Sequence, residues 1–138
     1  MFKHNIEYVD FNGNERNEDF YFHLSTPEVT RLEAKFGTAI DTYIKTLVDN
    51  QELAEMLNFL EDIILTSYGR KTTDGKSFIK NQQLRTEFEY SQAYAELFEE
   101  MILNPELVKR FGEGVSETAK HRQKKNTVEP MVKHEDSE

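Results

Sequence analysis

The segment with the clearest chemical potential is "GRKTTDGKS", from Gly69 to Ser77, which comes close to the glycine-rich loop that binds nucleotide phosphates. In that loop the second glycine stands five positions after the first, a strand precedes it and a helix follows it. Here the fifth residue after Gly69 is Asp74, whose carboxylate would repel phosphates, and the residues before Gly69 have a helical period. The segment therefore predicts no nucleotide site. It is better explained by a helix that ends at Gly69 and a turn at Asp74-Gly75.

The other reactive residues form no catalytic set. The four histidines are His4, His23, His121 and His134, and only the first two could face each other, at the base of a predicted hairpin. No carboxylate is placed beside them by spacing. The glutamate-rich segment 87–100, "EFEYSQAYAELFEE", lacks the Glu-x-x-His pairs of di-metal bundles, and the chain has no cysteine. We therefore expect no enzymatic activity, no cofactor and no metal.

Composition narrows the class of partner. The chain has 138 residues, 37% of them hydrophobic and 31% charged, which is enough for one domain with a real core. Its formal net charge is −9, and the acidic excess lies in residues 1–115. An acidic surface repels nucleic-acid phosphates, so nucleic acid is not the expected partner. The apolar runs are far too short to span a bilayer and no signal peptide is evident, so we expect a soluble intracellular protein with no membrane partner.

The N-terminal residues 2–24 predict a β-hairpin, because apolar and polar side chains alternate on both sides of "NGNERNE". A two-residue turn at Asn12-Gly13 would place Ile6 opposite Asp19. A loop of three or five residues, or an equivalent bulge, would instead let Ile6 meet Phe20 or Phe22 on one face. We therefore predict an odd-length loop.

The remaining residues up to 115 predict helices. A start signal at Thr26-Pro27-Glu28 precedes a segment that ends at Gly37, and Thr38 is a candidate cap for the next helix. The later expected segments are a helix at 51–68, a connecting loop at 69–79, a helical stretch at 84–88, a helix from about 91 to 102, and a short helix from Asn104 to Phe111 closed by Gly112 and Gly114. The predicted fold is thus α+β and mostly α: a single domain, 1–115, with an N-terminal hairpin on a bundle of about five helices. Residues 116–138 have no apolar period and are predicted to be disordered.

The surface offers two candidate contact regions for a protein partner. Ten Phe and six Tyr exceed what a small helical core needs, so aromatic and Met side chains on one helix face could hold another helix. The alternative is that most of these side chains are core. The basic loop would form a positive spot on a negative body. The candidate partner-binding residues are Arg70, Lys71, Lys76, Phe78, Tyr90, Tyr94, Phe98 and Met101.

Two long stretches, "EDFYFHLSTPEVTRLE" (18–33) and "LEDIILTSYGRKTTDGKSFIKNQQLRTEFEYSQAYAELFEEMILNPE" (60–106), resemble the tail assembly chaperones of long-tailed, siphovirus-type phages of Gram-positive bacteria. The shared features are an aromatic strand that runs into an acidic helix, the "SYG-K-DG--FIK" loop and "LR-EFE---AY-ELF". The resemblance covers residues 4–115, and none of its motifs is catalytic.

The resemblance implies a non-enzymatic role in tail morphogenesis. Such chaperones bind the tape-measure protein, keep it soluble and help recruit tail-tube subunits in the cytoplasm of the infected bacterium. They are not retained in the mature virion, and a weak homo-oligomer is expected. Two alternatives remain open: a small acidic regulator that inhibits a host or phage protein, and an enzyme that uses the lysine-rich loop.

Overall fold

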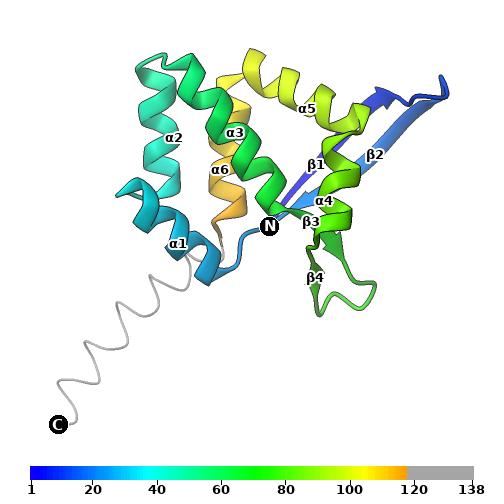
Figure 1. The fold of residues 1–138 in the computed structure, drawn as a ribbon, viewed down its shortest axis with the longest axis horizontal. Coiled ribbons are helices and arrows are strands. Elements are labelled where there is room, and N and C mark those ends of the chain that lie inside the picture. The colour runs from blue at the N-terminus through cyan, green and yellow to red at the C-terminus, as the bar shows by residue number, and fades with distance from the viewer. Residues whose placement is uncertain (118–138) are drawn as a thin grey trace, which may run out of the picture.

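The computed structural model describes residues 1–117, and within them six helices stand beside one antiparallel sheet of four strands (Figure 1). The strands are β1 (Phe2–Val9), β2 (Glu15–Phe22), β3 (Tyr68–Lys71) and β4 (Phe78–Ile79), in the order β1-β2-β3-β4. The helices are α1 (Thr26–Phe36), α2 (Ile40–Asp49), α3 (Leu53–Ser67), α4 (Gln82–Glu89), α5 (Gln92–Leu103) and α6 (Pro105–Val115). The predicted class, α+β and mostly α, is confirmed. The predicted disordered tail lies almost wholly outside the described residues.

The β1–β2 hairpin confirms the odd-length loop but differs in register. Its last pair is Val9 with Glu15, which leaves a five-residue loop. The Asp10 carboxylate accepts hydrogen bonds from the backbone N–H groups of Asn12 and Asn14, at 2.9 Å each, and this holds the loop. Ile6 lies opposite Glu18 rather than opposite the expected Phe20 or Phe22, because the loop is centred on Asn12 and paired residue numbers therefore add to 24.

The prediction of a plain connector at 69–79 is also wrong, because the segment contributes the two further strands β3 and β4. Tyr68 and Gly69 pair with Phe22 and Tyr21 of β2, so the chain enters the sheet directly after α3. Gly69 is therefore not a helix cap. A Cβ there would lie 2.6 Å from the Ile79 carbonyl oxygen, so a glycine is needed where β3 and β4 approach. The predicted turn is present, with Gly75 at φ +75°.

The helix starts follow capping chemistry with small shifts from prediction. Ser25, rather than Thr26, caps α1 in a capping box with Glu28. Asn104 caps α6 as its sequence predicts. Thr38 does not cap α2, since the cap position is Ala39, whose side chain makes no capping hydrogen bond; the Glu33 carboxylate of α1 instead accepts a hydrogen bond from the Ile40 N–H at 3.2 Å.

Helix α6 does not end at Gly112 but continues through both glycines to Val115. The helix continues because both glycines contact other parts of the fold. A Cβ on Gly112 would overlap Cδ1 of Ile44 on α2, and one on Gly114 would lie 2.8 Å from the Phe2 ring on β1. The two glycines therefore let α6 pack closely between a helix and the sheet.

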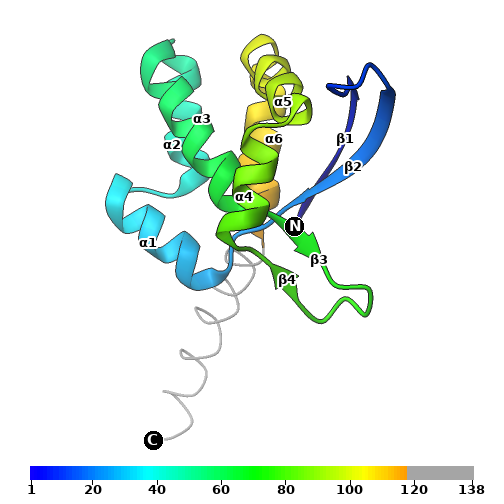
Figure 2. The ribbon, with the colours of Figure 1, turned by 45° about the vertical axis from the view of Figure 1, so that its right-hand side comes forward.

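Phe22 of β2 is fully buried at the centre of the core, where the sheet packs against the helices. Its ring lies 5.5 to 6.4 Å from the rings of Phe2, Tyr68, Phe88 and Phe111. Figures 1 and 2 show α5 and α6 beside β1, whereas α1, α2 and α3 lie on the side away from the hairpins. The largest fully buried side chains are Phe22, Phe111, Ile6, Leu24, Ile40, Ile44, Leu47, Leu60, Ile63, Ile64, Leu97 and Met101. None of the helices in residues 1–117 is long and apolar enough to cross a membrane.

Candidate partner-binding surfaces

Helix α5 presents a row of large side chains on one flank, which we call the aromatic stripe: Tyr90, Tyr94, Phe98 and Ile102. The four residues are spaced four apart, so those on the helix lie above one another on the same flank. Tyr90, just before the helix, is 73% exposed, and Ile102 is also exposed. Tyr94 and Phe98 are half-buried, with stacked rings 5.7 Å apart.

Met101, predicted as a partner contact with these aromatics, lies off the stripe. It is 0% exposed and shares the buried face of α5 with Ala93 and Leu97. Its spacing from Phe98 is three rather than four, which turns it inward. Met101 therefore belongs to the core, and we leave it out of the binding surface.

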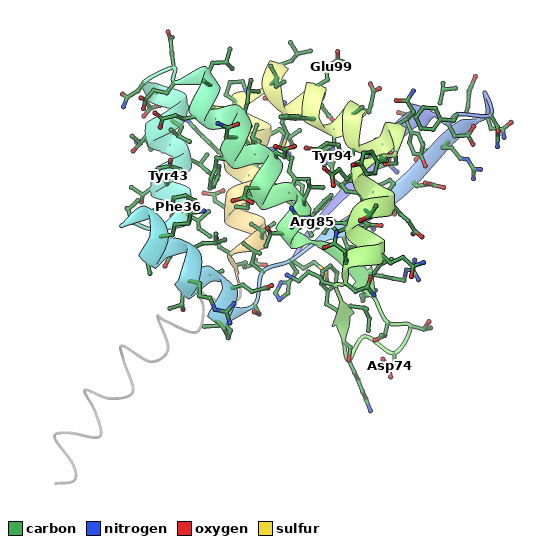
Figure 3. The ribbon with its side chains drawn as sticks, in the orientation of Figure 1. Phe36, Tyr43, Asp74, Arg85, Tyr94 and Glu99 are labelled. Carbon is green, nitrogen blue, oxygen red and sulfur yellow. The ribbon has the colours of Figure 1, made fainter. Side chains whose placement is uncertain are left out.

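Two carboxylates lie near Tyr94 of the stripe. Burial raises the pKa of Tyr94 to about 12, and the nearby carboxylates Glu61 of α3 and Glu89 of α4 add to this. Figure 3 shows Tyr94 and Arg85 on the same side of the molecule. A hollow of about 430 Å³ between α3 and α4 includes Glu61, Asp62, Arg85 and Glu89 in its lining. This surface combines one exposed and two half-buried rings with excess negative charge, which suits a helix that carries apolar and basic side chains.

The second candidate region is the β3–β4 hairpin with its turn, residues 68–79, which we call the basic hairpin. Arg70, Lys71 and Lys76 are exposed on it, and no ion pair joins any of them to another residue of the range 1–117. Lys71 Nζ lies 5.5 Å from the centroid of the Tyr21 ring. The hairpin projects away from the helices (Figure 2).

Phe78 faces the body of the protein, unlike the three exposed cations of the basic hairpin. It is half-buried, and its ring meets the edge of the His23 ring at 5.8 Å. Behind it, Lys80 Nζ donates to the His23 carbonyl oxygen at 2.9 Å and to Glu28 Oε1 at 2.6 Å. Phe78 and Lys80 therefore fix the root of the basic hairpin to the body.

A third surface, which the sequence did not suggest, lies on the other flank of α5. There a groove of about 320 Å³ separates α5 from β1, and we call it the acidic groove. His4 on β1 bonds Glu100 at 3.0 Å at its side. The groove exists only because β1 packs beside a helix about ninety residues later in the chain. Its lining residues are Asn5, Ile6, Glu7, Glu96, Glu99, Glu100 and Leu103.

A family model described as "phage tail assembly chaperone" matches residues 1–135. The chain belongs to this family. The resemblance is thus confirmed at the level of the family, while the type of phage and its Gram-positive host remain predictions. No curated protein and no solved structure matches the chain.

The two histidines within residues 1–117, His4 and His23, do not lie beside each other. His4 stacks on Phe2 and bonds Glu100, whereas the ring of His23, the residue after β2, lies against Phe78 of β4. Burial lowers the pKa of His23, so the ring favours its neutral form. Residues 1–117 hold no group of three or more His, Cys, Asp or Glu side chains that could bind a metal ion. His121 and His134 lie outside the described residues.

Proposed function

We propose that this chaperone is non-enzymatic and binds the tape-measure protein of its phage through the aromatic stripe. The observation that carries the proposal is the row of Tyr90, Tyr94, Phe98 and Ile102, partly exposed and flanked by carboxylates. A long helical client exposes apolar side chains before the tail is assembled. Helices are commonly recognised through anchors that recur every three or four residues, and the stripe has this spacing.

The acidic neighbours of the stripe favour a client that also carries basic residues. Glu61 and Glu89 lie near Tyr94, so Lys or Arg side chains of a bound helix would find carboxylates beside the apolar contact. The stripe is small, so binding through it is transient and releases the client when tail-tube subunits arrive. We place this activity in the cytoplasm of the infected bacterium, with tail-tube protein as the second partner and no chaperone left in the virion.

The test is calorimetry with overlapping tape-measure fragments of the same phage. We expect Tyr90→Ala to raise the Kd by about fivefold or more, because an aromatic anchor of an interface typically contributes above about 1 kcal/mol. The matched control is Phe11→Ala, which removes a ring of similar exposure, 76%, on the loop of the β1–β2 hairpin. An equal loss in both variants, or no binding of any fragment by the wild type, would refute the proposal.

The alternative is a small acidic regulator that binds a host or phage protein, and the acidic groove is the observation that favours it. A wild-type chaperone that binds no tape-measure fragment but captures a single host protein, with the capture lost in Glu96→Lys/Glu99→Lys, would support this alternative.

A further inference from the structure

A hollow of about 210 Å³ lies where α1, α2 and α3 meet, and we call it the aromatic pocket. The rings of Phe36 and Tyr43 line it, stacked with their centroids 4.5 Å apart, and Phe59 makes T-shaped contacts with both at 5.3 and 5.2 Å. Phe59 is buried, whereas the other two rings are half-buried and can be reached from solvent. Figure 3 shows Phe36 and Tyr43 close together, in a different part of the molecule from Tyr94 of the aromatic stripe.

The third wall of the aromatic pocket is polar and acidic. Glu55, Asn58 and Asp62 line it, and their spacing of three and four places them in one row on the exposed face of α3. No hydrogen bond or ion pair within residues 1–117 engages the Glu55 carboxylate. The pocket therefore sets ring faces, which attract cations, beside carboxylates, which pair with them.

A cation of the chain itself already lies at the edge of this pocket. Lys35 Nζ is 5.7 Å from the centroid of the Phe36 ring and 3.9 Å from Asp62 Oδ2. Both distances are near the upper limit for such contacts, and the Lys35 side chain is 65% exposed. An exposed pair of this kind contributes little to stability. A cation that fits the pocket better can therefore displace the Lys35 ammonium.

We propose that the aromatic pocket binds one arginine side chain of a protein partner. A guanidinium is planar and weakly hydrated, so it can lie against the Tyr43 ring while its N–H groups donate to the carboxylates of Glu55 and Asp62. An ammonium is compact and strongly hydrated, which makes lysine the weaker ligand. The hollow is smaller than the pockets of drug-sized ligands, which begin at about 300 Å³, and it suits a single side chain. The site does not depend on the identity of the client.

An NMR titration of the full-length chaperone with Nα-acetyl-arginine amide tests the proposal. The matched probe is the citrulline analogue, which has nearly the same shape but no charge. We expect the arginine probe to shift the ring resonances of Tyr43 along a saturating curve, with a Kd on the order of 1 mM, as suits a ligand of this size. The lysine analogue should bind several-fold more weakly, and the citrulline analogue should give no saturating shift.

Removing Lys35 gives the decisive result, because the proposal makes this residue a competitor of the ligand. Lys35→Gln should lower the Kd of the arginine probe by about twofold or more. The control Lys45→Gln removes the same charge from an exposed position on α2 that does not line the pocket, and it should bind like the wild type.

Three results would overturn the proposal: equal shifts with the arginine and citrulline probes, arginine shifts confined to resonances outside the pocket, or equal Kd values for Lys35→Gln and Lys45→Gln. Circular dichroism of each variant checks that it is folded. The titration uses no tape-measure fragment, so this proposal and the proposed function can fail independently.

Discussion

Gly69 allows β3 and β4 to approach each other closely because it has no side chain. A Cβ there would lie 2.6 Å from the Ile79 carbonyl oxygen and 2.6 Å from a carbon of the Phe78 ring. We expect Gly69→Ala to destabilise the chaperone by about 1–3 kcal/mol, since backbone cannot easily move aside. Urea unfolding measures the effect. Arg70→Ala, at the exposed neighbouring position, should change stability by less than about 0.5 kcal/mol. Equal effects of the two substitutions would contradict this explanation.

The Glu28 carboxylate links three segments of the chain and should make stability depend on pH. Burial raises the pKa of Glu28, but hydrogen bonds from Lys80 and from the Ser25 N–H outweigh it and hold the pKa below its usual 4.5. Stability from a lowered pKa is present above the unfolded value and is lost as pH falls through the folded one.

We therefore expect Glu28→Gln to cost about 1–3 kcal/mol near neutral pH, where the wild type has charge-assisted hydrogen bonds. The difference between the variant and the wild type should shrink as the pH falls below 4.5 and through the lowered pKa of Glu28, because the wild-type carboxyl then becomes protonated. Denaturant unfolding across the acid range provides the measurement. A difference that stays constant with pH would show that the charge of Glu28 is not the cause.

At the scale of elements, α6 packs closely against α2 where Gly112 meets the side chain of Ile44. Alanine normally stabilises a helix by about 1 kcal/mol over glycine, but a Cβ on Gly112 would overlap Cδ1 of the buried Ile44. We expect Gly112→Ala alone to destabilise. Ile44→Val removes Cδ1, so Gly112→Ala in that background should be neutral or stabilising. A double-mutant cycle on the free energy of unfolding tests the coupling, and strict additivity would refute it.

For the whole molecule, the net charge of −9 creates a repulsion that salt should relieve. The ion pairs of residues 1–117 lie mostly at exposed positions and contribute little, so their screening costs less than the repulsion that is removed. We expect the thermal midpoint to rise by several degrees between low salt and about 0.5 M sodium chloride, at a concentration too low for self-association. Glu61→Gln/Glu89→Gln should show a smaller rise, and a fall in the wild type would contradict the argument.

Some residues of the candidate binding surface could be predicted from the sequence, whereas others depend on tertiary packing. Tyr90, Tyr94 and Phe98 could be selected from the sequence, because helical spacing alone puts them on one flank. Met101 could not be excluded that way, since only the packing of α5 shows which side of the aromatic row faces the core. The acidic groove needed β1 beside α5, a contact between segments far apart in the sequence.

The sequence by itself determined the type and approximate bounds of most elements, the parity of the hairpin loop and the family. These follow from local causes: side-chain period, capping groups and turn residues act within a few positions. Only the tertiary structure decided the register of β1 on β2, the entry of β3 and β4 into the sheet and the passage of α6 through two glycines. Each of these depends on a distant neighbour, such as Phe22 beside Tyr68 or Ile44 above Gly112, whose position no local pattern encodes.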